Sequence, residues 1–115
     1  MRFINYCFIC IISITSFLMA DLLKPSAGQF ISYLHVLFEW EQEPDANSYN
    51  IQVSTSSNFS NIILDSNTDN IVYIFKDGQI NWSDSYYWRV RPIYSDGLYG
   101  EWIDQRLFRT RSSNT

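Results

Sequence analysis

The sequence predicts an all-β protein, a sandwich of seven antiparallel strands preceded by a helical segment at the N-terminus. Two observations after residue 20 support this fold class. No segment there shows the helical spacing of apolar residues over about ten positions. Instead, short runs rich in Val, Ile, Tyr, Phe and Trp are separated by Pro, Gly, Asn, Asp or Ser. The breaks recur at intervals of about 8–12 residues, which is typical of a two-sheet sandwich.

The seven expected strands cover residues 22–25, 36–41, 48–54, 61–64, 71–75, 86–91 and 102–110. The first is stopped by Pro25, because proline cannot donate to a strand ladder. The second places Phe38 and Trp40 on one face and Glu39 on the other, since side chains alternate along a strand.

A turn around Pro44 and Asp45 leads to the third strand, which alternates with Tyr49 and Val53 on its inner face. The fourth is short, as expected of an edge strand. The fifth, at 71–75, is apolar on both faces, so its inner face is not fixed by the pattern. The sixth and seventh alternate again, and the large side chains expected in the core are Trp40, Tyr49, Tyr86, Trp88, Val90 and Phe108.

Residues 1–20 have the composition of a secretory signal peptide. Arg2 is a short positive start, residues 6–12 are an apolar run, and we expect cleavage after Ala20. Polar residues interrupt the apolar stretch, whereas a membrane span needs about 20 predominantly apolar residues. We therefore expect an exported protein, secreted or at the cell surface, with no membrane contact after cleavage.

The expected organisation is a signal peptide at 1–20, one β-sandwich domain at 21–110 and a polar tail at 111–115. Both cysteines precede residue 21, so the mature domain holds no disulfide, thiolate metal site or cysteine nucleophile. The chain has a net charge of −4, which is too acidic for a nucleic-acid binder that works through bulk positive charge. We expect a monomer.

An ordered set of residues resembles the fibronectin type III family, in its bacterial form. Trp40 lies in the second strand and is followed by Pro44 and Tyr49, and Ile80 precedes Tyr86 by six residues. The run at 86–91 and the closing segments 101–102 and 108–110 extend the resemblance over residues 22–110. It implies an immunoglobulin-like sandwich, with the ring of Tyr86 buried and its hydroxyl bonded to the backbone of the preceding loop.

Residues suited to catalysis are few. His35 is the single histidine and precedes the second strand, where we expect it to be exposed. Glu39, Glu41 and Glu43 alternate along that strand and its exit, as on a solvated sheet face. We therefore expect no enzyme activity, no cofactor and no bound metal.

One sheet face is the best candidate for binding. Tyr87, Arg89 and Arg91 point outward from the sixth strand, and Asn50 and Gln52 are expected beside them from the third. Arg and Tyr are enriched at protein interfaces, although an ordinary solvated face would have the same pattern.

The loop at 94–100 is the second candidate, because Tyr94, Leu98 and Tyr99 lie close to its tip; alternatively, Tyr99 folds back on the sandwich. The resemblance implies a non-catalytic binding or spacer module for a protein or a surface polysaccharide, and the chain could be part of a larger secreted protein. Two alternatives use this loop. One is a secreted hydrolase inhibitor, and the other is a carbohydrate-binding module with exposed rings at Trp82, Tyr94 and Tyr99.

Overall fold

The computed structural model describes residues 20–76 and 78–113. The helical segment expected within residues 1–20 lies outside this part, apart from Ala20. In the described residues the chain forms eight strands and no helix. The strands are β1 (Leu22–Lys24), β2 (Gln29–Ile31), β3 (Val36–Trp40), β4 (Ser48–Ser54), β5 (Ile62–Thr68), β6 (Val72–Phe75), β7 (Ser85–Ile93) and β8 (Asp104–Thr110).

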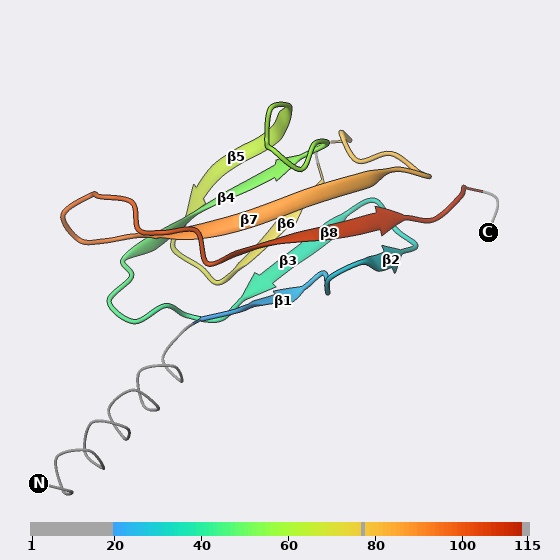
Figure 1. The fold of residues 1–115 in the computed structure, drawn as a ribbon. Coiled ribbons are helices and arrows are strands. Elements are labelled where there is room, and N and C mark those ends of the chain that lie inside the picture. The colour runs from blue at the N-terminus through green and yellow to red at the C-terminus, as the bar shows by residue number, and fades with distance from the viewer. Residues whose placement is uncertain (1–19, 77, 114–115) are drawn as a thin grey trace, which may run out of the picture.

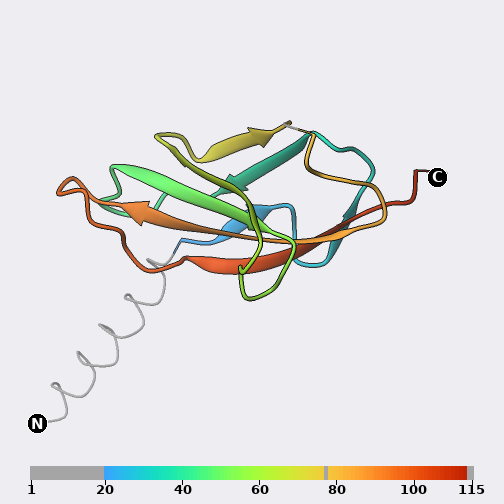
Figure 2. The ribbon, with the colours of Figure 1, turned by 90° about the horizontal axis from the view of Figure 1, so that it is seen from above.

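The strands form two layers, which confirms the predicted all-β, two-sheet architecture. One sheet has the order β1-β3-β6, and the other has the order β2-β8-β7-β4-β5. Figure 1 and Figure 2 show the two layers facing each other, with the loop between β7 and β8 at one end. Every strand pair is antiparallel except β2 with β8.

The expected count of seven strands was wrong, because β2 is an eighth. It pairs in parallel with the end of β8, where Ile31 is opposite Thr110. The amide of Gly28 donates to the carbonyl of Leu107 at 2.7 Å, and Gly28 has a positive φ of 73° that glycine adopts easily. A strand of three residues with one buried side chain has too short an alternation to be recognised in a sequence.

Other boundaries also differ from the expected ones. The edge strand expected at 61–64 is an edge strand, but it extends to Thr68 because β4 pairs with it along its full length. The last strand begins at Asp104, two residues after Trp102. In β6, whose inner face the pattern left open, Phe75 is buried while Ile74 is exposed.

The core lies between the two sheets and is rich in rings. Phe38 of β3 contacts Trp88 of the opposite sheet, with ring centroids 5.0 Å apart, and Phe108 at 5.7 Å. Trp40 packs edge-on against Tyr49 at 5.6 Å. Each buried aromatic side chain removes about 150–250 Å² from water. All six side chains expected in the core are buried: Trp40, Tyr49, Tyr86, Trp88, Val90 and Phe108.

A buried tyrosine anchors a loop at each end of the sandwich. The hydroxyl of Tyr86 accepts a hydrogen bond from the backbone N–H of Asn81 at 2.7 Å, as the resemblance implied. At the other end the hydroxyl of Tyr49 accepts one from the N–H of Glu43 at 2.9 Å. Burial raises the pKa of both tyrosines above its usual value, because the charged phenolate would lose its hydration.

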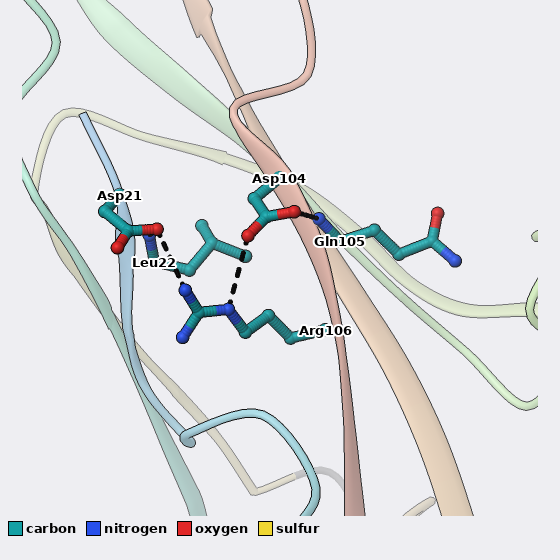
Figure 3. A network of polar contacts seen from close by, with 5 residues as sticks. All are labelled: Asp21, Leu22, Asp104, Gln105 and Arg106. Carbon is teal, nitrogen blue, oxygen red and sulfur yellow. Dashed lines mark hydrogen bonds and ion pairs between the residues drawn. The ribbon is translucent and has the colours of Figure 1, made fainter. Parts of the chain in front are cut away.

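A small ionic network joins the start of β1 to the start of β8. The guanidinium of Arg106 donates to the carboxylate of Asp21 at 2.9 Å and to that of Asp104 at 3.3 Å (Figure 3). The same carboxylates accept from the backbone amides of Leu22 and Gln105. Both carboxylates are about half exposed, so each pair contributes little to stability, about 1 kcal/mol or less.

Candidate binding surfaces

Arginine and aromatic side chains stack on the outer face of the five-stranded sheet. The guanidinium carbon of Arg89 lies 4.0 Å from the ring centroids of both Phe59 and Trp102. That of Arg91 lies 4.3 Å from Trp102 and 3.8 Å from Tyr99. Cation and ring therefore alternate through these five side chains, which we call the arginine layer. Such contacts contribute about 0.5–2 kcal/mol each, more as water is excluded.

Two side-chain amides of β4 accept hydrogen bonds from the two arginines. Arg89 donates through Nε and Nη2 to the side-chain oxygen of Gln52, at 3.0 and 2.8 Å. Arg91 donates through Nε to the side-chain oxygen of Asn50 at 3.1 Å. The strand register explains the match, because Gln52 is opposite Arg89 and Asn50 is opposite Arg91 in the β4–β7 ladder.

The same amides donate to β5 on their other side. Asn50 donates to one oxygen of the Asp65 carboxylate at 2.7 Å, and Gln52 donates to the other at 3.1 Å. Asn50 also donates to the side-chain oxygen of Asn67. A hydrogen-bond network thus crosses β7, β4 and β5. Asn50 and Gln52 lie beside the arginines as expected, but they are only 2% and 6% exposed and so are buried beneath the arginine layer.

The guanidinium groups of Arg89 and Arg91 are surrounded mostly by neutral groups. Among the described residues, neither Arg89 nor Arg91 has a carboxylate within ion-pair distance. Burial and the nearby charge of Arg91 lower the pKa of Arg89, and Asp65 opposes that effect. Arginine stays protonated at any ordinary pH, so the layer keeps two positive charges under rings and amides. The face predicted to bind a partner is largely engaged within the sheet.

The loop between β7 and β8 is closed by backbone hydrogen bonds. Tyr94 donates to the carbonyl of Leu98 at 3.0 Å and accepts from Gly97 at 2.8 Å, and Gly100 donates to Pro92 at 2.8 Å. The Gly97 φ of 84° suits glycine. Leu98 is 66% exposed at this loop, and it is more exposed than any other large apolar side chain described.

Tyr99 combines the two alternatives considered for it. Its ring rests on the guanidinium of Arg91, so it folds back onto the sheet, and it forms a β-bridge with Ile93. The side chain is nevertheless 52% exposed. Tyr94 is less exposed and lines a small cavity of about 200 Å³ together with Glu43 and Trp102. The loop therefore continues the arginine layer to the end of the molecule, where Leu98 lies in water.

The three rings proposed for carbohydrate binding do not form one platform. Trp82 precedes β7, whereas Tyr94 and Tyr99 follow it. Because a strand of nine residues separates them, Trp82 lies at the opposite end of the sandwich, as Figure 1 shows for the two loops. This arrangement does not favour the carbohydrate-binding alternative at loop 94–100.

A shallow groove at the β6–β7 end was not foreseen from the sequence. It has a volume of about 420 Å³ and is bordered by Phe30 of β2, the segment 83–85 and the chain at 109–112. The guanidinium of Arg109 lies 5.5 Å from the centroid of the Phe30 ring, which is 52% exposed. No sequence signal indicated this groove, because it depends on the pairing of β2 with β8.

The outer face of the three-stranded sheet carries several exposed apolar side chains beside Glu39, which is opposite Val72 in the β3–β6 ladder. Leu23, Leu37, Val72 and Ile74 are each between 38% and 59% exposed. Leu37 and Ile74 are opposite each other in the β3–β6 ladder. Contiguous exposed apolar side chains of this kind commonly mark an interaction site.

His35 and Glu41, both considered for catalysis, lie at opposite ends of β3. His35 is exposed before β3, and Glu41 is exposed after it. Within the described part of the chain no group of His, Cys, Asp and Glu is arranged to hold a metal ion. The same part contains no helix of the length and hydropathy that a membrane span requires.

Comparisons with known proteins bear on the fold. No family model and no curated protein matches the chain. A solved Fn3-like protein from Clostridium thermocellum is 20% identical, with a TM-score of 0.58, over 74% of this chain and 88% of its own.

Two further solved structures are similar. An α-L-rhamnosidase from Streptomyces avermitilis, in complex with L-rhamnose, is 18% identical over 80% of this chain, with a TM-score of 0.60, but this chain spans only 10% of that protein. CopC from Methylosinus trichosporium OB3b is 14% identical, with a TM-score of 0.53, over 84% of this chain and 97% of its own. Together with the topology, these likenesses show a fibronectin type III-like β-sandwich.

Proposed function

We propose that the protein is an exported, non-catalytic binding module of the fibronectin type III family, and that it contacts a partner protein through the loop at 94–100. The observation that carries the proposal is the rigid presentation of Leu98. Its side chain is 66% exposed, in a loop closed by three backbone hydrogen bonds. A loop already held in its binding conformation loses little entropy on association.

The arginine layer supports this role by fixing the base of the loop. Tyr99 is stacked on Arg91, and Arg91 is held by Asn50 of β4. The tip of the 94–100 loop is therefore connected, through Tyr99 and Arg91, to the hydrogen-bond network that crosses β7, β4 and β5. Leu98 would be the apolar anchor of the contact, and the exposed edge of the Tyr99 ring would extend it.

The accessory parts of the proposal come from residues 1–20. Their composition supports export, to secretion or the cell surface, with cleavage after Ala20. The size of the domain and the likeness to a tenth of a rhamnosidase chain support a role as one module within larger secreted assemblies. On this proposal the chain needs no cofactor.

The test is differential capture from the culture medium and cell-surface extract of the source organism. Immobilised wild-type protein is compared with Leu98→Ser and with Ile62→Ser, a control at a 40% exposed residue of β5. We expect a partner that is retained by the wild type and the control and lost with Leu98→Ser. Equal retention by all three, with unchanged melting temperatures, would exclude the loop as the binding element.

A hydrolase inhibitor is the second candidate, because inhibitors present a rigid loop with an exposed anchor. Figure 1 and Figure 2 show the β7–β8 loop extending beyond the neighbouring loops at its end of the sandwich. Here the measurement is the residual activity of representative secreted proteases and glycosidases with excess protein. Inhibition that Leu98→Ser abolishes would select this candidate, and full activity throughout would reject it.

A further inference from the structure

A small cavity beside the base of the β7–β8 loop is bordered by acidic and aromatic side chains. It has a volume of about 200 Å³, and its lining includes two carboxylate side chains and two rings, those of Glu43, Glu101, Tyr94 and Trp102. Neither glutamate makes an ion pair with a described residue. Carboxylates and the faces of aromatic rings both attract cations such as ammonium groups. The chain itself reaches this cavity, because Ala20 is also part of the lining.

The residue that follows Ala20 is held in place by three hydrogen bonds. The carbonyl of Asp21 accepts from the N–H of Glu41 at 2.8 Å. Its carboxylate accepts from the N–H of Leu22 at 2.9 Å and from the guanidinium of Arg106 at 2.9 Å (Figure 3). All three partners come after residue 20, and none of the bonds uses the backbone nitrogen of Asp21. That nitrogen therefore keeps its place beside the cavity when residues 1–20 are removed.

We propose that this cavity is the docking site of the mature N-terminus, where the α-ammonium group of Asp21 binds to the carboxylates of Glu43 and Glu101. The inference rests on the cleavage after Ala20 that is part of the proposed function. Hydrolysis of that peptide bond adds one water molecule, leaving a carboxylate on Ala20 and an amino group on Asp21. The amino group is protonated at neutral pH, and the departing Ala20 leaves space for it in the cavity. Hydrogen bonds from a charged donor to a carboxylate are about twice as strong as neutral ones.

The charged groups around this nitrogen are mainly acidic. Five carboxylates and one guanidinium lie on the segments that meet here, those of Asp21, Glu41, Glu43, Glu101, Asp104 and Arg106. Arg106 is already paired with Asp21 and Asp104, which leaves the two glutamates of the cavity for the ammonium. The phenol of Tyr94 is neutral below about pH 10. Nearby carboxylates stabilise the charged form of an amine, so we expect the pKa of this α-amino group to lie above its ordinary value of about 8.

A docked N-terminus connects the two sheets at the base of the loop proposed for binding. Asp21 precedes β1 of the three-stranded sheet, whereas Tyr94 is the first residue of the loop at 94–100. Glu43 is partly buried and Glu101 is exposed, so water screens the first of the two contacts less. We therefore expect Glu43 to contribute more than Glu101 to holding the ammonium.

The experiment uses the mature chain beginning at Asp21, which contains all eight strands and every core residue. The α-amino group is titrated by NMR through the ¹³C shifts of Asp21. We expect a pKa above the ordinary value, which falls in Glu43→Gln, less in Glu101→Gln, and most in the double variant. The control is Asp84→Asn, which removes an exposed carboxylate before β7, at the other end of the sandwich, and should leave the titration unchanged. Melting curves verify that all four variants fold.

Acetylation of the N-terminus tests the same contact by removing the charge of the amine. The acetylated mature chain should melt about 4 °C lower, the shift expected for the loss of one favourable charge contact in a domain of this size. In the Glu43→Gln/Glu101→Gln variant the acetyl group should have no such effect, which separates lost charge from added bulk. An ordinary pKa in the wild type would overturn the proposal, and so would equal effects of acetylation in the two chains.

The N-terminal sequence of the chain recovered from the medium of the source organism tests the cleavage separately. A start at Asp21 is expected. A start elsewhere would reject the cleavage after Ala20, and the docking with it. A start at Asp21 together with an ordinary titration would reject the docking alone and leave the proposed export intact.

Discussion

The two sheets differ in how far the side chains on their outer faces are covered by other side chains. On the five-stranded sheet, Arg89 and Arg91 are stacked between rings and hydrogen-bonded to buried amides, so most of that face is covered by its own side chains. On the three-stranded sheet, Leu37 and Ile74 are exposed and nothing among the described residues covers them. The first face adds stability to the domain, whereas the second is available for contact.

This difference follows from where bulky residues lie along the chain. The loop before β5 supplies Phe59 and the segment before β8 supplies Trp102, and both lie against the arginines of β7. Strand β6 is four residues long and sits at an edge, so no comparable loop crosses its outer face. The comparison therefore predicts large effects of substitutions on one face and small effects on the other.

The largest effect is expected at Trp102, the ring that contacts both arginines. Trp102→Ala removes two cation–π contacts and a half-buried ring, and should lower the free energy of unfolding by about 2–3 kcal/mol. Urea denaturation followed by tyrosine and tryptophan fluorescence measures the change. A loss no larger than that of an exposed surface substitution would show that the arginine layer is not structural.

Gln52 tests the amides beneath that layer. Gln52→Ala leaves the partly buried guanidinium of Arg89 without its acceptor, and should cost about 2 kcal/mol. Asp65 also loses one donor, but this carboxylate is exposed to water. Gln52→Glu is the matched variant. It keeps an acceptor for Arg89 but sets two carboxylates together, so it should recover only part of the loss in chemical denaturation. Full stability in both variants would contradict the role of the network.

Tyr86 provides a reference for these losses of stability, because it lies at one end of the sandwich and on neither outer face. Tyr86→Phe keeps the buried ring and removes the hydroxyl that accepts from Asn81, and should cost about 1 kcal/mol or more. Thermal unfolding measures it. A melting temperature equal to that of the wild type would contradict the importance of this bond.

A pH dependence accompanies that bond. The pKa values of Tyr49 and Tyr86 are raised by burial, so above about pH 10 the unfolded chain releases protons that the folded chain retains. Their contribution to stability is complete below pH 10 and is lost as the pH rises toward the folded-state values. The free energy of unfolding of the wild type should therefore fall more steeply above pH 10 than that of the Tyr49→Phe/Tyr86→Phe variant. Parallel curves would contradict the burial effect.

The smallest effect is expected on the exposed apolar face. Leu37→Thr keeps a branched side chain in β3 and removes apolar area that is already 38% exposed, so the free energy of unfolding should change by about 0.5 kcal/mol or less. Chemical denaturation measures this change. A loss as large as that at Trp102 would mean that the two faces do not differ.

The inner faces of the sheets could be predicted from the sequence, whereas the outer face of the larger sheet could be predicted only in part: alternation places Arg89 and Arg91 beside the amides of β4, but it does not identify the rings that cover them. Alternation with a period of two identifies Trp40, Tyr49 and Trp88 as inward, and it requires no knowledge of which strands are neighbours. The arginine layer depends on strand order and on loop residues such as Phe59, which no periodicity marks. For the same reason, β2 and the open edge of β6 became visible only with the pairing of the strands.

The coupling free energy between Arg89 and Trp102 measures most directly whether the outer face of the larger sheet is held by its own side chains. A double-mutant cycle combines Arg89→Met, which keeps much of the aliphatic packing, with Trp102→Leu, which keeps an apolar side chain. We predict a favourable coupling of about 0.5–2 kcal/mol in chemical denaturation. A coupling indistinguishable from zero would contradict it, because the guanidinium and the ring would then stabilise the domain independently.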